Sequence, residues 1–388
     1  MLKNKRIGNY LNQSVVGGHY NAYIPQDLPP APPLDLQVLY PYLEKATKAL
    51  AELNSSTQAI PNTSLFIYMY VRKEALLSSQ IEGTQSSFSD LILFEHAQKP
   101  SVSLDDVEEV SNYVQAIKHA LSRIENGFPL SLRLLKETHA ILLKGVRGSH
   151  KYPGEFRRTQ NWIGGTKPSN AFFVPPPPEY LTELLGNLEN FLHDETHHLP
   201  VLIQAGLLHV QFETIHPFLD GNGRLGRLLI TLLLCQKELL LEPILYLSLY
   251  LKQNRTIYYD LLQQVRTHGT WETWLEFFLE GVYITATQAV LTTQTINKLF
   301  DTDLAKIETL GRVKFTCLTL FEFLKRLPQV SVASVAQELS ISAPTARNAL
   351  KALETLGILK EISGKQRDKV YVYKKYLDVL EEGSEPIK

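Results

Sequence analysis

The sequence is poor in cysteine and has almost no excess of either charge. Its 388 residues include two cysteines, Cys235 and Cys317, and both sit among apolar residues. We therefore expect two buried free thiols and no disulfide or metal pair, which fits a reducing compartment. The formal net charge of −1 gives the whole chain no sign of nucleic-acid or polyanion binding, although such an average does not exclude a local basic patch.

Long uninterrupted apolar runs are also missing. The opening stretch MLKNKRIGNYLNQS lacks the apolar core of a signal peptide. The most apolar stretch, LGRLLITLLLCQKELLLEPILYL, is interrupted by Arg227, Lys237, Glu238 and Pro243, whereas a membrane span needs about 20 apolar residues in a row. We expect a buried core helix here, in a cytoplasmic protein without a membrane partner.

The hydrophobic periodicity predicts a mainly α-helical chain, preceded by an extended proline-rich stretch over 20–35. Helices are expected over 36–53, up to a stop at Gly83, over 105–124 and 131–143 with Asp105 and Ser131 as N-caps, and over 179–192, 199–215, 224–240, 257–266 and 271–294. The length allows two to three domains. We divide the chain into an N-terminal region 1–98, a core 99–295 and a C-terminal unit 305–388, with a boundary near 295–312.

Two segments depart from the helical pattern. Residues 149–178 hold two short β-prone runs around a turn, which predicts a β-hairpin or flap. In the C-terminal unit, helices are expected over 314–326, 332–338 and 344–356, the last with Ser342 as its N-cap. Two strand-like runs around a polar tip follow, so the unit is predicted to be a helix-turn-helix with a β-wing.

The stretch HPFLDGNGRLGR, from His216 to Arg227, places a polar, glycine-rich joint between two apolar helices. Pro217 should end the first helix near His216. The glycines around Asn222 let the backbone turn tightly and approach a ligand. The second helix then begins with free N–H groups and a dipole that favours an anion.

The side chains of the joint point to chemistry on a nucleotide. Arg224 and Arg227 share a face on the first helical turn, where they oppose the dipole, and guanidinium groups bind phosphates bidentately. Asp220 is a hard oxygen ligand of the kind that holds Mg²⁺ together with phosphate oxygens. His216 titrates near neutrality and is a candidate base. The alternative is a capped loop with surface arginines.

The joint resembles the signature of the Fic family, His-x-Phe-x-Asp/Glu-Gly-Asn-Gly-Arg-x-x-Arg. All of its defined positions are present: His216, Phe218, Asp220, Gly221, Asn222, Gly223, Arg224 and Arg227. The proteins it resembles transfer AMP from ATP to a serine, threonine or tyrosine hydroxyl of a target protein. The resemblance also implies a Fic-type helical core with a β-hairpin flap.

By that resemblance, each residue of the joint has an expected role. His216 is the catalytic base, Asp220 holds Mg²⁺, Phe218 anchors the loop, and ATP phosphates bind at Gly221, Asn222, Gly223, Arg224, Leu225, Gly226 and Arg227. A phosphotransferase branch of the family has lysine where this chain has Gly223. The glycine therefore favours nucleotidyl over phosphoryl transfer.

A second motif, SSQIEGT, places Ser78 and Glu82 one turn apart at the end of a helix. A carboxylate there opposes the helix dipole, at a cost of about 0.3–1 kcal/mol. An exposed helix-end glutamate is the simple interpretation. The segment also resembles the inhibitory motif Ser/Thr-x-x-x-Glu-Gly/Asn of many Fic proteins, which implies that Glu82 pairs with Arg227 and keeps the γ-phosphate out.

Two further segments resemble nucleotide- and target-binding parts of Fic proteins. The expected flap includes Ile163, Gly164, Gly165 and Thr166, although a purely structural hairpin fits each side chain nearly as well. The segment YLSLYLKQNRTIYYDLL resembles the lining of the adenine pocket, with Gln253, Tyr258 and Tyr259 as candidates. Tyrosines at helical spacing are more often part of a core.

The C-terminal unit is locally basic. It carries Arg347, Lys351, Lys360, Lys365, Arg367, Lys369, Lys374 and Lys375 against Glu354, Glu361 and Asp368. DNA binding through phosphates is one hypothesis, and a winged helix used for packing or dimerisation is the other.

We therefore expect an auto-inhibited protein adenylyltransferase that modifies a target protein and itself. Its expected substrate is ATP and its expected cofactor is Mg²⁺. In one form of this hypothesis, the enzyme also removes AMP from the target. A homodimer is expected. The alternatives are a nucleotide-responsive DNA-binding regulator and a Fic enzyme with another donor, such as CDP-choline.

Overall fold

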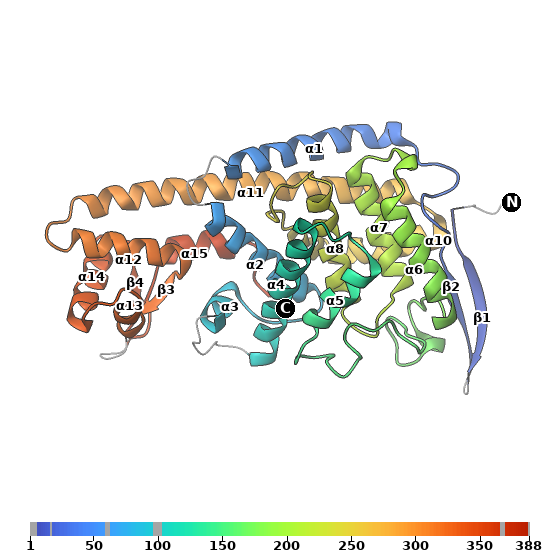
Figure 1. Ribbon diagram of the computed structural model, residues 1–388, viewed down its shortest axis with the longest axis horizontal. Coiled ribbons are helices and arrows are strands. Elements are labelled where there is room, and N and C mark those ends of the chain that lie inside the picture. The colour runs from blue at the N-terminus through green and yellow to red at the C-terminus, as the bar shows by residue number, and fades with distance from the viewer. Residues whose placement is uncertain (1–5, 16–17, 59–62, 96–102, 365–368, 387–388) are drawn as a thin grey trace.

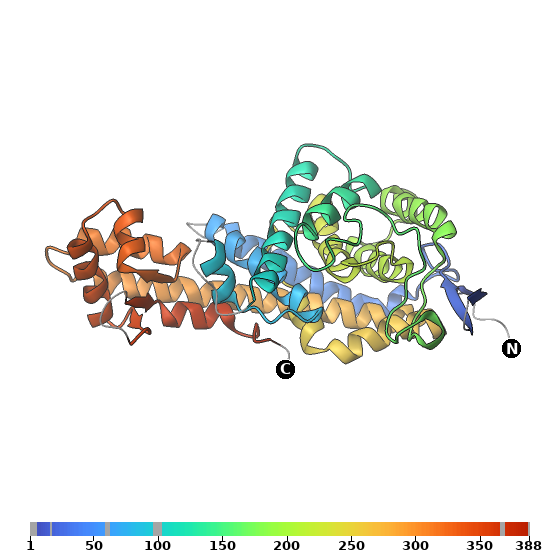
Figure 2. The ribbon, with the colours of Figure 1, turned by 90° about the horizontal axis from the view of Figure 1, so that it is seen from below.

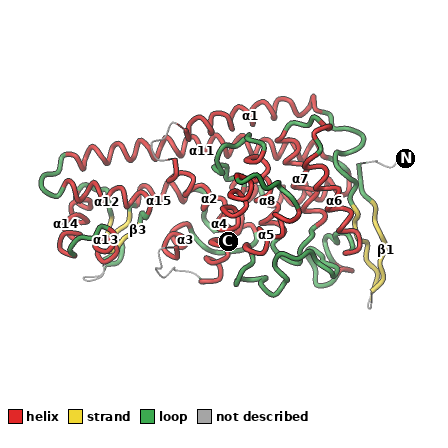
Figure 3. Tube along the Cα trace, in the orientation of Figure 1, coloured by secondary structure: helices red, strands yellow, loops and turns green. Residues whose placement is uncertain are grey.

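The structure is a computed structural model that describes residues 6–15, 18–58, 63–95, 103–364 and 369–386. Its helices are α1 (Leu36–Gln58), α2 (Thr63–Ile81), α3 (Phe88–Glu95), α4 (Leu104–Glu125), α5 (Leu132–Leu142), α6 (Leu181–His193), α7 (Val201–Ile215), α8 (Asn222–Gln236), α9 (Ser248–Gln253), α10 (Arg255–His268), α11 (Trp271–Glu308), α12 (Lys314–Arg326), α13 (Val332–Glu338), α14 (Ala343–Thr355) and α15 (Lys374–Glu381). Its strands are β1 (Asn9–Val15), β2 (Gly18–Ile24), β3 (Gln329–Ser331), β4 (Lys360–Glu361) and β5 (Val370–Val372). The mainly helical fold confirms the prediction (Figure 3).

Two long helices run along one side of an elongated molecule (Figure 1). Helix α1 packs along α11, and the other helices of the central part lie beneath this pair. Helix α7 is buried on almost every side, and the buried residues include the polar Gln204, His209, Gln211 and Glu213. It packs against α8, so the end of α7 and the start of α8 meet in the interior of the fold.

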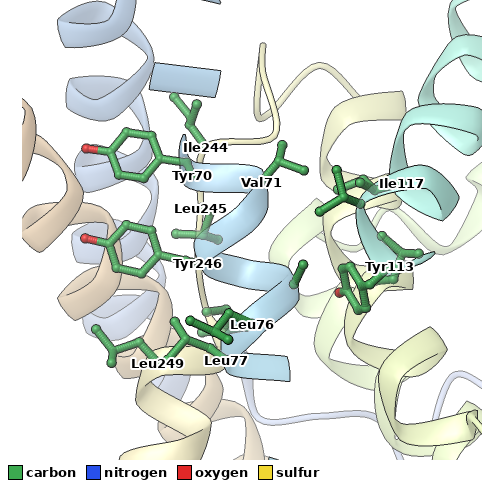
Figure 4. Close-up of a cluster of buried hydrophobic side chains, with 14 of the residues drawn as sticks. Tyr70, Val71, Leu76, Leu77, Tyr113, Ile117, Ile244, Leu245, Tyr246 and Leu249 are labelled. Carbon is green, nitrogen blue, oxygen red and sulfur yellow. The ribbon is translucent and has the colours of Figure 1, made fainter. Parts of the chain in front are cut away.

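The core extends from α8 to the N-terminal helices. Tyr70 of α2 stacks on Tyr246, with 5.4 Å between the ring centroids, and Figure 4 shows the two rings one above the other, next to Leu245. Tyr113 of α4 lies on the other side of α2 in the same view. This packing holds α2, the helix with the SSQIEGT motif, against the rest of the core.

The C-terminal unit lies at the opposite end of the molecule from the β1–β2 hairpin (Figure 2). It contains α12, α13 and α14 and an antiparallel three-stranded sheet in the order β3-β5-β4. Ser342 caps α14, because its hydroxyl accepts a hydrogen bond from the Thr345 N–H, as predicted. The assignment as a winged helix and the division into domains stay predictions.

After β5, still within the predicted unit 305–388, the chain returns to the centre of the molecule. Helix α15 packs against α11 and α3, and the segment behind it reaches the end of α2. Gln80 of α2 donates a hydrogen bond to the Ser384 carbonyl (2.8 Å) and accepts one from the Lys252 ammonium (2.7 Å). Lys252 also binds the carbonyl oxygen of Glu385.

Several element boundaries differ from the sequence-based expectation. Helix α11 continues to Glu308, so no linker occupies the stretch 295–308. Helix α4 begins after Ser103 and not after Asp105, which lies in its first turn, and α8 ends at Gln236. The hairpin β1–β2 was not expected, because its strands, NYLNQSV and GHYNAYI, do not keep the regular alternation of apolar and polar residues that marks a half-buried strand.

The expected β-hairpin over 149–178 is mostly loop. One antiparallel bridge, between Ile163 and Phe173, ties it together, and a short 3₁₀ turn (Pro168–Asn170) lies at its tip. Gly164 and Gly165 have φ values of +70° and +68°, which end the strand geometry directly after Ile163. A helix that meets the length and apolar composition of a bilayer span does not occur in the part of the chain described here.

Candidate active site

The joint between α7 and α8 has the geometry that its sequence predicts. His216 ends α7 in the left-handed region (φ 50°), and Gly221 does the same before α8 (φ 75°). The Asn222 side chain closes the loop, because its Oδ1 accepts from the Phe218 N–H (2.9 Å) and its Nδ2 donates to the Phe218 carbonyl (2.8 Å). These two bonds within the joint support its loop between Phe218 and Asn222.

A histidine that the sequence did not reveal supports the loop from below. His139 of α5 stacks on the fully buried Phe218 ring at 3.7 Å between centroids. Its Nδ1 accepts from the Gly154 N–H (2.8 Å), so its Nε2–H donates to the Asp220 carbonyl (2.9 Å). Burial lowers the pKa of His139 to about 4, which keeps the ring neutral in this role.

The joint opens onto a cavity of about 780 Å³, within the range of small-molecule sites. Its lining includes His216, Asp220, Gly221, Asn222 and Gly223. The arginines around it are Arg147, Arg224, Arg227, Arg255 and Arg266. Such a concentration of guanidinium groups favours a ligand with several negative charges.

His216 lines this cavity as a neutral imidazole. Its Nδ1 is buried and lies 3.9 Å from the Glu213 carboxylate, so Nε2 is the nitrogen left for a ligand. Burial and the positive charges of Arg157 and Arg266 lower the pKa of His216 to about 3. A neutral imidazole is the form that accepts a proton.

Arg227 is held by the SSQIEGT motif. Its Nη2 lies 2.7 Å from Glu82 Oε1 and donates to the Ser78 carbonyl, and its Nε donates to the Ser78 hydroxyl (2.9 Å). Burial raises the pKa of Glu82, but the charges of Arg227 and Arg224 outweigh burial and lower it overall, so the pair is ionised. The structure brings together the two motifs that the sequence linked only by resemblance.

The Glu82 carboxylate lies directly over Gly223. A Cβ atom at Gly223 would come within 2.2 Å of Glu82 Oε1. Any side chain at this position would displace the carboxylate. Gly223 is therefore needed for the ion pair in the observed arrangement.

Arg224 has a different partner, which sequence reasoning also missed. Its Nη1 lies 2.7 Å from the Oε1 of Glu109 on α4, and both side chains are almost fully buried. Its Nη2 is 3.6 Å from Asp220 Oδ1. The sequence places Glu109 on the buried face of a predicted helix, which indicates that its charge needs a partner. It does not indicate which residue that partner is.

Not every predicted site residue reaches the cavity. Ile163 and Gly164 line it, whereas Gly165 and Thr166 do not. Leu225 is fully buried in the core and its N–H donates to the Gly221 carbonyl, so that N–H is not available to a phosphate. The Gly226 carbonyl accepts from His209 behind the cavity wall.

Of the residues predicted to line an adenine pocket, two line the cavity and one does not. Tyr258 and Tyr259 line the cavity, but Tyr258 is also a core residue whose hydroxyl bonds the buried His209 (2.8 Å). Gln253 lies beside Gly383 and not at the cavity. Arg266, Glu213 and Trp162 line the cavity and were not predicted.

A helix-end histidine, a carboxylate and two arginines of one helix thus line a single cavity. Residues 40–122 match the Fic/DOC family N-terminal domain, and residues 129–234 match the Fic/DOC family. The chain thus contains a Fic N-terminal domain and a Fic domain.

Curated relatives carry the name protein adenylyltransferase Fic. The protein from Drosophila grimshawi is 29% identical over 221 residues, which are 56% of this chain and 41% of the relative. The protein from Culex quinquefasciatus is 30% identical over 226 residues, 57% of this chain and 41% of the relative. The chain thus spans about two fifths of the length of these relatives.

Solved structures share the fold. A Fic family protein from Desulfovibrio desulfuricans G20 aligns with a TM-score of 0.58 and 18% identity, over 86% of this chain and 95% of the other. A Fic domain containing signaling protein from Bacteroides thetaiotaomicron VPI-5482 aligns with a TM-score of 0.52 and 20% identity, over 64% of this chain and 97% of the other. The architecture is therefore that of Fic proteins.

Proposed function

We propose that the protein is a protein adenylyltransferase that transfers AMP from ATP to a serine, threonine or tyrosine hydroxyl of a target protein and of itself. The observation that carries this proposal is the shared cavity of His216, Asp220 and Arg227, whose volume and charge suit a nucleoside triphosphate. The names of the relatives point to the same reaction.

In this reaction the target hydroxyl attacks the α-phosphorus while its proton passes to Nε2 of His216. A phosphoester bond forms, the bond between the α-phosphorus and the bridging oxygen breaks, and pyrophosphate leaves. Backbone N–H groups at the start of α8 and the guanidinium of Arg224 bind the phosphate oxygens. Phe218 and His139 hold the loop that positions these groups.

The residues present fit a Mg²⁺ ion bound through Asp220. Its half-buried carboxylate lines the cavity, and one carboxylate together with phosphate oxygens is a common way to hold this ion. Among the described residues, no group of three or more His, Cys, Asp or Glu side chains lies together, so phosphate oxygens of the nucleotide would supply further ligands to the ion. When bound, the ion neutralises charge on the leaving phosphates.

We further propose that the enzyme is held inactive by Glu82. The carboxylate neutralises Arg227 and lies over Gly223, where the outer phosphates of a bound nucleotide would need both positive charge and space. Displacement of Glu82 would release Arg227 for the γ-phosphate. The same carboxylate beside the site would suit removal of AMP as well.

The decisive experiment follows transfer of α-³²P-labelled AMP to protein. The Glu82→Gly variant should label itself and proteins of a cell lysate, and a second substitution, His216→Ala, should reduce labelling by about 10²–10⁴-fold, the usual contribution of a general base. Unlabelled GTP, UTP and CDP-choline added as competitors test the donor. Equal labelling with and without His216 would overturn the proposal.

DNA binding is proposed as a second property of the C-terminal unit, because Arg347, Lys351 and Lys360 are exposed on α14 and β4. The predicted contributors Lys365 and Arg367, and the opposing Asp368, lie outside the described residues. An association constant for duplex DNA that does not fall as the salt concentration rises would exclude this property.

We also propose that the protein is a homodimer. Sedimentation at several protein concentrations tests this proposal.

A further inference from the structure

Arg224 lies between two carboxylates that face different surroundings. Glu109 Oε1 is 2.7 Å from Nη1, and Asp220 Oδ1 is 3.6 Å from Nη2. The Glu109 side chain is 3% exposed, whereas that of Asp220 is 36% exposed and lines the cavity. Arg224 is thus in close contact with Glu109, which does not line the cavity, and at a longer distance from Asp220, which does.

The choice of partner has a physical consequence for Asp220. A buried guanidinium needs a counter-ion, because an uncompensated buried charge costs several kcal/mol. Glu109 supplies that charge from α4. The Asp220 carboxylate, four residues before Arg224 in the joint, is therefore not required for this purpose.

Without the Glu109 charge, Asp220 is the next carboxylate within reach of Arg224. A guanidinium and a carboxylate form two parallel hydrogen bonds when they are free to turn toward each other. Such a pair would occupy the oxygens that a hard cation uses. The other charged group near Glu109 is Arg147, whose Nη2 lies 3.4 Å from the same Oε1. Because Arg147 is also a cation, it cannot supply the negative charge that the loss of Glu109 would remove.

We propose that Glu109 is a positioning residue that holds Arg224 at 3.6 Å from Asp220 and prevents a tight, two-bond pair between them, so that the Asp220 carboxylate can bind Mg²⁺. The inference rests on the proposed function, because it takes Mg²⁺ and a nucleoside triphosphate as the ligands. It adds a residue outside the signature motif and outside the cavity wall to the machinery of the site. Glu109 does not line the cavity, so its effect on a bound ligand would be indirect, through the position of Arg224.

The test measures binding of α,β-methylene-ATP, which is not cleaved, to the full chain with Glu82→Gly, at a series of Mg²⁺ concentrations. Adding Glu109→Gln should raise the Mg²⁺ concentration for half-maximal binding by about tenfold, equal to about 1.4 kcal/mol. Glu109→Asp should stay nearer to the parent. Glu108→Gln, on the neighbouring position of α4, is the matched control and should leave the midpoint unchanged.

A double substitution separates positioning from folding. Removing the competing cation with Arg224→Met in addition to Glu109→Gln should return the Mg²⁺ midpoint to within about threefold of the parent, even where nucleotide affinity stays low. A midpoint that remains raised in the double variant, or a Glu109→Gln midpoint equal to that of the control, overturns the inference. A parent that binds no Mg²⁺–nucleotide overturns the proposed function together with it.

Discussion

Arg224 and Arg227 stand one turn apart at the start of α8. Each lies 2.7 Å from a carboxylate of an earlier segment, Glu109 of α4 and Glu82 directly after α2. The carboxylates differ in their surroundings: Glu109 is 3% exposed, whereas Glu82 is 32% exposed. A buried ion pair is costly to break. When the carboxylate is solvent-exposed, the arginine can leave it at a lower cost and bind a ligand instead. The difference indicates a fixed structural pair beside an exchangeable one.

The largest expected effect is on stability. Glu109→Ala should destabilise the protein by about 3–5 kcal/mol, because it leaves Arg224 as a buried charge without its nearest counter-ion. Glu82→Ala should cost less, because water can reach the space that the Glu82 carboxylate leaves and Ser78 still binds the equally buried Arg227. Urea unfolding of both variants measures the difference. Equal losses would remove the distinction between the pairs.

The next effect is on nucleotide affinity. Glu82→Gly should raise the affinity for ATP by about tenfold to a hundredfold, or about 1.4–2.7 kcal/mol, because it removes the group that neutralises Arg227 over Gly223. Calorimetric titration with ATP and Mg²⁺ measures it, and Glu82→Gln, which keeps the size but not the charge, should lie between the two. An affinity unchanged by Glu82→Gly would mean that this pair does not hold the site closed.

The smallest effect concerns Glu213, which is buried like Glu109 but has no hydrogen-bond partner for its Oε1 among the described residues. Burial raises its pKa to about 7, against the influence of Arg227. Between about pH 4.3 and 7, the folded protein holds a proton on Glu213 that the unfolded chain has released, so this group stabilises the fold less as the pH rises.

Glu213→Gln carries no such proton. Relative to the natural chain, this variant should therefore gain stability, on the order of 1 kcal/mol, when the pH is raised from 5 to 8. Thermal unfolding midpoints at several pH values measure the gain. A difference between the two proteins that does not change with pH would show that Glu213 is not protonated in the fold.

Much of the fold and of the joint could be predicted because their signals are local. Periodicity located most of the helices, Pro217 and the glycines located the joint, and Ser131 and Ser342 were found as caps from residue type alone. The β1–β2 hairpin carries no such local signal. The length of α11 was missed although residues 295–308 contain neither glycine nor proline and so carry no signal that ends a helix.

The missed site residues depend on contacts between distant segments. Glu109 is 115 residues from Arg224 in number, and nothing near either residue identifies the pair. His139 looks like one more polar residue of an amphipathic helix until Phe218 is seen stacked on it. Conversely, Gln253 was expected from a resemblance between segments, and the fold turns it toward Gly383.

The contact of the C-terminal segment with Gln80 has a practical consequence. Gln80 lies between Ser78 and Glu82 on α2, and it is held by the Ser384 carbonyl and by Lys252, which binds the Glu385 carbonyl as well. A shortened gene that stops after α15 would remove these contacts and with them a support of the turn that carries Glu82. Basal activities of this protein are therefore best compared between preparations that share the same C-terminus.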